Sequence, residues 1–246
     1  MSHNPAAYGD AFAADYDVRF GPIEPDGAEV RFLVEHASGG PLLELGIGTG
    51  RFALPLVAAG LEVHGIDASR AMVERLRSKP GGDRIPVTVA DFRDVPAPRR
   101  DYGLVLVAFN TLLALLTQED QLTTIRGSAA RLRPGGCLVV EAFVPDLLRF
   151  DRGQTLRTQG VLADGVRLEA SVHDAVRQRV DTREVTIDGG RVTTRTIAIR
   201  YVWPSELDLM ARVAGLVPEA RYASWGKAPF GRASTNHISV FRKLPA

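Results

Sequence analysis

Short apolar runs alternate with longer segments of helical periodicity through the first 150 residues. Five runs are nearly continuous in apolar character: Leu42–Leu45, Leu61–Ile66, Ile85–Ala90, Leu104–Phe109 and Cys137–Phe143. Such runs are typical of parallel strands that are covered on both faces. Between them, Ser69 is placed to cap a helix through Arg77, and a helical pattern runs from Gln118 to Leu132 until Pro134-Gly135-Gly136. The pattern predicts a parallel sheet with helices on both sides.

After residue 150 the apolar positions recur with period two, which predicts an antiparallel meander. Its turns are expected at Ala163-Asp164-Gly165 and Asp188-Gly189-Gly190. Pro204 then opens a helix that ends near Gly215, and two last strands follow around 217–225 and 236–241. The alternating side chains are Leu168, Ala170 and Val172, then Val185 and Ile187, then Ile197, Ile199 and Tyr201.

Composition adds that the chain is an ordinary folded protein without a nucleic-acid or membrane signature. It has 246 residues, 45% hydrophobic and 24% charged, with a formal net charge of +1. This balance disfavours a basic stripe for nucleic acid or an anionic membrane. The single cysteine, Cys137, cannot form an internal disulfide. No cationic segment followed by an apolar segment opens the sequence, and the longest apolar stretch, 103–116, is too short to span a bilayer, so we expect a cytoplasmic protein.

The segment Glu44-Leu45-Gly46-Ile47-Gly48-Thr49-Gly50-Arg51 carries the clearest chemical signal. It follows the first predicted strand and precedes a helix, where glycines allow a sharp turn and a close approach of a nucleotide-like ligand. A tight turn without a ligand is the simpler alternative. The dinucleotide fingerprint G-x-G-x-x-G needs its third glycine one residue later, where this chain has Arg51. We expect Arg51 itself to be a solvated or ion-paired helix residue.

That glycine spacing resembles the class I S-adenosylmethionine (SAM) dependent methyltransferases. Further segments match the family in the same order. Asp67 matches the acid that accepts the ribose hydroxyls, and Asp91-Phe92 match the pair that contacts the adenine. Ala108-Phe109-Asn110 match the end of strand four that faces the sulfur, and 132–136 match the turn before strand five. Taken alone, Asp67 and Asp91 can also be helix caps, and Phe92 and Phe109 core aromatics. The resemblance implies these cofactor contacts: Tyr16, Glu44, Gly46, Gly48, Gly50, Asp67, Ala68, Met72, Asp91, Phe92 and Ala108.

The expected fold is therefore α/β, a seven-stranded, mostly parallel, Rossmann-like methyltransferase sheet with helices on both faces and an inserted antiparallel meander. We expect one domain over residues 1–246. It divides into a helical lead-in or lid (1–36), a SAM-binding core (37–150), the antiparallel insertion (151–203) and a final helix with a β-hairpin (204–246). The insertion is expected to cover the active site or to form a subunit interface of a homo-oligomer.

The reaction implied is transfer of the SAM methyl group to a small molecule, with S-adenosyl-L-homocysteine as the product. The resemblance is to N-methyltransferases of bacterial antibiotic pathways, which favours nitrogen over oxygen as the acceptor atom. No metal is expected, because metal-dependent catechol methyltransferases have an acid where this chain has Ala108-Phe109-Asn110. The alternatives are an O-methyltransferase of a small hydroxylated metabolite and an NAD(P)-dependent oxidoreductase on a similar fold.

Candidate catalytic residues come from the lead-in, strand four and the last strand pair. Tyr8, Phe12 and Tyr16 are spaced i, i+4 and i+8, on one side of a predicted helix. By the resemblance, Tyr8, Tyr16 and Phe109 form the acceptor shell beneath a lid; the alternative is an amphipathic helix packed on the body. His237, in the last strand pair, and His173, in the meander, are candidate general bases; the alternative for each is a structural or surface histidine.

Overall fold

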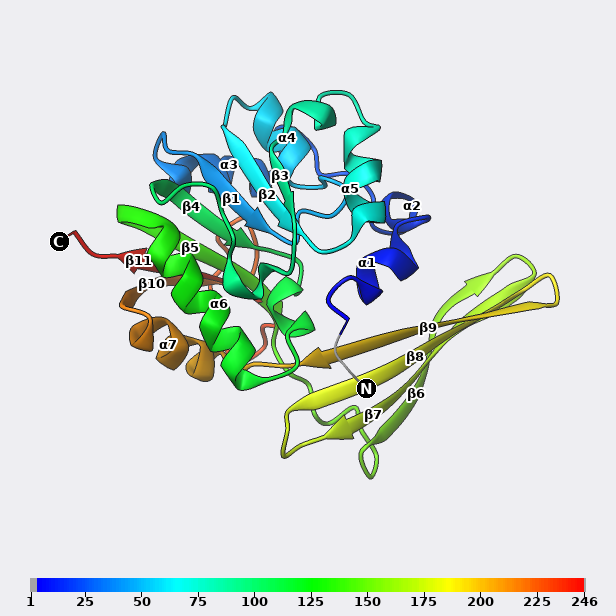
Figure 1. Cartoon of the computed structure of the whole chain (residues 1–246). Coiled ribbons are helices and arrows are strands. Elements are labelled where there is room, and N and C mark those ends of the chain that lie inside the picture. The colour runs from blue at the N-terminus through cyan, green and yellow to red at the C-terminus, as the bar shows by residue number, and fades with distance from the viewer. Residues whose placement is uncertain (1–3, 246) are drawn as a thin grey trace.

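The structure, a computed structural model, describes residues 4–245 and consists of an α/β body with a second, four-stranded sheet beside it (Figure 1). Residues 1–3 of the predicted lead-in and Ala246 of the predicted hairpin lie outside the described range. Within that range, no helix has the length and apolar character needed to cross a membrane.

The body is built on a seven-stranded sheet, here called sheet A, in the order β10-β11-β5-β4-β1-β2-β3. The five strands β5, β4, β1, β2 and β3 run parallel to one another, and β11 is antiparallel to both β5 and β10. This arrangement confirms the predicted fold. The strand bounds are β1 Leu42–Leu45, β2 Val63–Asp67, β3 Val87–Val89, β4 Tyr102–Val107, β5 Leu132–Phe143, β10 Leu216–Tyr222 and β11 Asn236–Lys243.

Helices cover both faces of sheet A, because successive strand residues point to opposite faces. On one face, Leu43, Val105 and Leu138 pack with the helices α6 (Gln118–Arg131) and α7 (Pro204–Val213). On the other face, Leu42 and Leu104 pack with α3 (Ala28–Ala37) and α4 (Ala53–Ala58). The helix α5 (Arg70–Arg77) follows β2, and short 3-10 helices occupy Gly82–Arg84, Phe92–Asp94 and Thr111–Ala114.

Helix α6 ends earlier than the sequence pattern predicts. Leu132 already has extended backbone angles and pairs with Tyr102 of β4, so Pro134-Gly135-Gly136 lies within β5 and does not terminate the helix.

The lead-in is not the single helix that the i, i+4, i+8 aromatic spacing predicts. It forms α1 (Ala7–Phe12) and α2 (Tyr16–Phe20), with a break at 13–15. Distant side chains hold the break: Arg75 donates to the Ala14 carbonyl at 2.8 Å, and Arg195 to the Asp15 carboxylate at 2.8 Å. Tyr8 and Tyr16 therefore lie on separate short helices.

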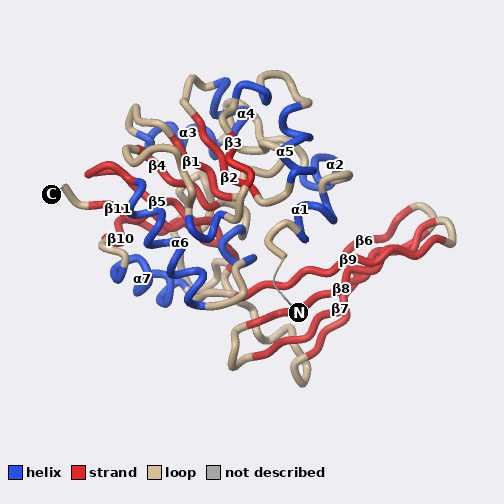
Figure 2. Tube along the Cα trace, in the orientation of Figure 1, coloured by secondary structure: helices blue, strands red, loops and turns tan. Residues whose placement is uncertain are grey.

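The insertion is the predicted antiparallel meander, here called sheet B, which extends away from the body (Figure 2). It comprises β6 (Gln154–Leu162), β7 (Gly165–Asp174), β8 (Arg179–Asp188) and β9 (Arg191–Arg200). Its inner face, defined here by Val180, Thr182 and Glu184, contacts the lead-in and the body. Its outer face carries Leu156, Val172 and their neighbours, which belong to none of the three apolar clusters of the described chain.

Candidate functional site

The glycine segment forms a tight loop between β1 and α4. Gly46 has φ +72°, and a Cβ there would lie 2.6 Å from the Thr111 side chain, so only glycine fits. Gly48 also has positive φ, +55°, but a Cβ at this position would meet only the Gly46 carbonyl oxygen at 3.9 Å. The backbone at Gly48 is therefore open to a ligand.

Asp67, at the end of β2, faces this loop. One carboxylate oxygen accepts the Gly48 N–H and the other the Ser69 N–H, each at 2.8 Å. Burial raises the pKa of Asp67, while these two N–H groups act to lower it. The cap of α5 is Ser69, whose hydroxyl accepts the Met72 N–H, so the alternative of Asp67 as the cap is wrong. Each Asp67 oxygen keeps a lone pair for a hydroxyl of a ligand.

Glu44 lies beside Asp67 in β1 and is only 4% exposed. Its Oε2 atom is buried without a hydrogen-bond partner among the described residues. Burial and the nearby Asp67 carboxylate raise the pKa of Glu44 well above its ordinary value, and Arg51 acts against them. A buried carboxyl oxygen without a partner is costly, so this position calls for a donor that the chain itself does not provide.

Asp91 and Phe92 follow β3 as predicted. One Asp91 oxygen accepts the Arg93 N–H at 2.9 Å and caps the following 3-10 helix, so the cap role is confirmed. The Phe92 side chain is buried in the apolar cluster with Ile66 and Val95. Both residues lie at the carboxyl edge of sheet A, where parallel α/β sheets bind ligands.

At the end of β4, Phe109 and Asn110 both adopt left-handed backbone angles, with φ +51° and +66°. Glu141 of β5 holds this turn: its carboxylate accepts the Phe109 N–H at 2.7 Å and the Trp225 indole N–H at 2.9 Å. Asn110 in turn accepts the Phe143 N–H at 2.8 Å. Glu141 is a functional residue that the motifs do not include; its one signal in the sequence is an acid inside an apolar strand.

Aromatic side chains of the lead-in meet Phe109 and form an aromatic cluster, defined as Tyr16, Phe20 and Phe109. Phe20 lies 5.0 Å from Phe109 and 4.8 Å from Tyr16, between ring centroids. The Arg51 guanidinium lies 4.7 Å above the Phe109 ring, and its Nε donates to the Gly21 carbonyl. Arg51 is half-buried and takes part in no ion pair of the described residues, contrary to the expected solvated or ion-paired role.

Both lead-in tyrosines are protonated at neutral pH. Burial raises the pKa of Tyr8 to about 12, with Arg19 acting against it. The pKa of Tyr16 is raised by burial, and the charges of Arg51, Glu44 and Asp67 act on it as well. Their hydroxyls can therefore donate and accept hydrogen bonds but do not act as ionised bases near pH 7.

The lead-in is attached to the core around the glycine loop. Asp17 accepts from the Thr49 hydroxyl at 2.6 Å and from the Lys79 ammonium at 2.8 Å. Asp10 accepts from the Ser69 hydroxyl at 2.6 Å. These bonds bring the predicted residues Tyr16, Glu44, Asp67 and Phe109 into one region at the carboxyl edge of sheet A.

The remaining predicted residues lie around this region or away from it. Met72 is buried against Phe12 beneath the lead-in, Ala68 is half-buried beside Asp67, and Ala108 is buried at the end of β4. His173 contacts the Tyr201 hydroxyl at 3.1 Å within the insertion.

His237 is fully buried in β11 and does not join the aromatic cluster. It pairs with Ala142 while Ile238 pairs with Glu141, so the His237 and Glu141 side chains point to opposite faces of sheet A. Its Nδ1 contacts the Ser239 hydroxyl at 2.9 Å, and its Nε2 is buried without a hydrogen-bond partner in residues 4–245. Burial, followed by Arg221, lowers the pKa of His237 to about 4. This position does not support the predicted role of general base.

Comparison with known proteins identifies the family. Residues 42–136 match the family model of a methyltransferase domain. The whole structure is similar to the CcbJ methyltransferase of Streptomyces caelestis, with a TM-score of 0.89, 36% sequence identity, and coverage of 98% of this chain and 99% of that one. The chain belongs to the class I SAM-dependent methyltransferases. The NAD(P)-dependent oxidoreductase considered above is thereby ruled out.

Two further relatives extend the likeness over the whole chain. The cypemycin N-terminal methyltransferase of a Streptomyces species is 26% identical over 98% of this chain and 99% of its own. The structure of SAM-bound CalS10, an amino pentose methyltransferase from Micromonospora echinaspora, has a TM-score of 0.70 at 22% identity, covers 95% of this chain and 97% of that one, and shares the fold.

The methyltransferase uses SAM, which supplies a methyl group bound to a positively charged sulfur. The residues present fit this cofactor: an open backbone at Gly48, free lone pairs on Asp67 and an unpartnered oxygen on Glu44 suit its hydroxyl and amino groups. Among residues 4–245, no three His, Cys, Asp or Glu side chains are grouped so as to hold a metal ion.

Proposed function

We propose that the enzyme transfers the SAM methyl group to a nitrogen atom of a small molecule in secondary metabolism and releases S-adenosyl-L-homocysteine. The similarity to the CcbJ methyltransferase carries the methyl transfer, because it spans 98% of the chain and so includes the lead-in and sheet B as well as the common core. The relative named as an N-terminal methyltransferase supports nitrogen as the acceptor atom. The net charge of +1 favours a small acceptor over a nucleic acid.

Asp67 is proposed to bind the ribose hydroxyls, and Asp91 the adenine amino group next to the Phe92 ring. Both aspartates have an oxygen lone pair left after their backbone hydrogen bonds. The Arg51 guanidinium is available for the cofactor carboxylate, since it forms no ion pair within residues 4–245. The other proposed cofactor contacts are Tyr16, Glu44, Gly46, Gly48, Gly50, Ala68, Met72 and Ala108.

Tyr8, Tyr16 and Phe109 are proposed as the acceptor shell, with residues 1–36 as a lid. An amine attacks the methyl carbon only after it has lost its proton, because the protonated form has no lone pair. The tyrosine hydroxyls can orient the neutral amine, and the aromatic faces favour positive charge at the reacting centre. The contacts between the lead-in and both Thr49 and Ser69 support closure of this segment over the site.

The proposal is tested by incubating the enzyme with isotopically labelled SAM and a library of amines and hydroxylated metabolites from bacterial lysate. We expect the label in one small amine, bound to nitrogen. Label on an oxygen atom selects the O-methyltransferase alternative, and label on nucleic acid or protein contradicts the small-molecule assignment.

Replacement of Asp67 tests the cofactor assignment without knowledge of the acceptor. Asp67→Ala removes the acceptor of the ribose hydroxyls and is expected to weaken SAM binding by about 1–3 kcal/mol in calorimetry. Asp83→Ala, at an exposed position after α5, is the matched control and should leave the affinity unchanged. Equal affinity of both variants would refute the ribose role.

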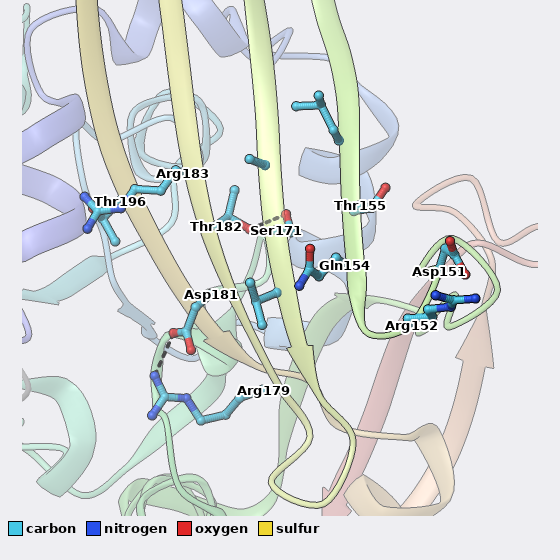
Figure 3. A pocket seen from close by; sticks show the side chains of 13 residues that line it. Asp151, Arg152, Gln154, Thr155, Ser171, Arg179, Asp181, Thr182, Arg183 and Thr196 are labelled. Atoms are coloured by element: carbon cyan, nitrogen blue, oxygen red, sulfur yellow. Dashed lines mark hydrogen bonds and ion pairs between the residues drawn. The ribbon is translucent and has the colours of Figure 1, made fainter.

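We further propose that copies of the chain associate through the outer face of sheet B. A shallow cavity of about 940 Å³ lies on this face, with Thr196, Arg183 and Gln154 contributed by different strands (Figure 3). Leu156 and Val172 on the same face are 70% and 57% exposed. Apolar side chains on an uncovered sheet favour association with a second copy, because closed symmetric contacts cover both surfaces at once.

A further inference from the structure

A second cavity, of about 200 Å³, lies between the carboxyl end of β5 and the inner face of sheet B. Phe143 at the end of β5 and Val180 on β8 both line it. Phe150 and Tyr201 add aromatic surface, and two arginines, Arg149 and Arg157, also line it. The cavity thus combines apolar walls with two guanidinium groups.

Arg149 has no carboxylate partner in an ion pair within the described part of the chain. Its guanidinium lies 4.7 Å above the Phe150 ring. The side chain is half-buried, and burial followed by the charge of Arg157 lowers its pKa, while the charges of Glu169 and Asp146 act to raise it. Two cations close together on a partly buried surface are stabilised when an anion lies between them.

Arg157 is only partly neutralised by its neighbour Glu169. Its Nη2 lies 3.4 Å from both Glu169 oxygens, at the long end of hydrogen-bond distances. The same carboxylate also accepts from Gln159 and from the Ser171 hydroxyl. The acid that lines the cavity itself is Asp146, which accepts the Leu148 N–H at 3.1 Å.

The cavity adjoins the turn that carries Phe109. Its wall residue Phe143 donates its backbone N–H to Asn110, the residue after Phe109. The residue that follows Phe109 is therefore bonded to a residue that lines this cavity. Resting on the proposed function, we propose that the cavity binds an oxyanion of the acceptor, a carboxylate, sulfonate or phosphate, between Arg149 and Arg157.

The binding test uses inorganic phosphate as the probe and the full-length enzyme, by calorimetry at constant ionic strength. We expect saturable phosphate binding that weakens at least tenfold in Arg149→Met and in Arg157→Met. Arg177→Met is the matched control: it removes the same charge from a side chain that is 75% exposed at the β7–β8 turn, and should bind as the wild type does. SAM affinity should be equal in all four proteins.

No phosphate binding by the wild type, or wild-type affinity in Arg149→Met, overturns the proposed site. If thermal denaturation shows that the Arg149→Met variant does not fold, Arg149→Lys is used in its place. It keeps the charge but loses the planar fork, and should bind phosphate several-fold more weakly. An unchanged affinity in that variant overturns the proposal in the same way.

A kinetic test assigns the anion to the acceptor. With the acceptor found by labelled methyl transfer, phosphate should inhibit competitively against the acceptor and not against SAM. Inhibition that is not competitive with the acceptor overturns the assignment to its oxyanion. Methyl transfer without phosphate binding leaves the proposed N-methyltransferase function standing while the oxyanion site fails, so the two outcomes are distinguishable.

Discussion

Glu141 determines the geometry at the end of β4 although it is absent from the recognisable motifs. Two consecutive residues in left-handed conformation are unfavourable for side chains such as that of Phe109. The Glu141 carboxylate offsets this by accepting the Phe109 and Trp225 N–H groups at once. An ionised carboxylate suits both donors, because it has acceptor lone pairs on each oxygen.

Glu141→Gln is therefore expected to destabilise the protein, because its amide NH₂ must face one of two N–H donors. We expect a loss of about 1–3 kcal/mol in the free energy of unfolding in urea, with a changed Trp225 fluorescence spectrum. Glu35→Gln, at an exposed ion pair with Lys227, is the control and should change stability by about 0–1 kcal/mol. A Glu141→Gln variant as stable as this control would show that the two bonds do not hold the turn.

The burial of His237 is expected to make the free energy of unfolding depend on pH. Its pKa in the fold is about 4 against 6.5 for the free side chain, so between these values the unfolded chain binds more protons. The free energy of unfolding contributed by His237 therefore falls as the pH is lowered through this window, by about 3 kcal/mol in total. Buried carboxyls with raised pKa, such as Glu141, act in the opposite direction, so a difference measurement is needed.

We expect the stability difference between wild type and His237→Gln, from urea unfolding, to shift toward the variant as the pH falls from 7.5 to 4.5. A difference that is the same at every pH would contradict the buried, neutral state of His237.

At the scale of elements, the sequence pattern located the strands of sheet A and the meander because buried strands leave continuous or alternating apolar runs. The pattern also placed Asp67 at the end of a strand, but its ribose role came from the resemblance to the methyltransferases and stays a prediction. It missed the break in the lead-in because the bond that holds Asp15 comes from Arg195, 180 residues away. Alternation also shows which residues share a face of sheet B, but not which face meets the body.

The lead-in is expected to detach from the glycine loop when the hydrogen bonds of Asp17 are removed. Asp17→Asn weakens the pairing with Lys79 and with the Thr49 hydroxyl, which are partly exposed, so the loss is about 1 kcal/mol. Amide hydrogen exchange should then become faster across residues 7–20 while β1 to β5 stay protected, and SAM affinity should fall several-fold.

Asp26→Asn, exposed in the segment between α2 and α3, serves as the control for the lead-in. Unchanged exchange in Asp17→Asn relative to this control would mean that the other contacts of the lead-in, such as the ion pair of Arg19 with Glu184, hold it without Asp17.

At the scale of the whole molecule, the two faces of sheet B have different tasks. The inner face binds the lead-in through Glu184, and its Val180 lines the second cavity, which contains Arg149 and Arg157. The outer face carries apolar residues that none of the three apolar clusters of the described chain includes. Sheet B thus lies between the proposed acceptor shell on its inner side and the proposed interface between copies on its outer side.

This division predicts that assembly can be abolished without loss of the cofactor site. The double variant Leu156→Glu/Val172→Glu places charges on the outer face of sheet B and should convert an oligomer into a monomer of 26.6 kDa, as measured by light scattering after size exclusion. SAM affinity should be unchanged, because both positions lie on the side away from the lead-in. Val176→Glu, 95% exposed beyond the end of β7, is the control and should keep the wild-type mass. A wild type that is monomeric at all concentrations, or a double variant of unchanged mass, would show that the outer face is not the interface.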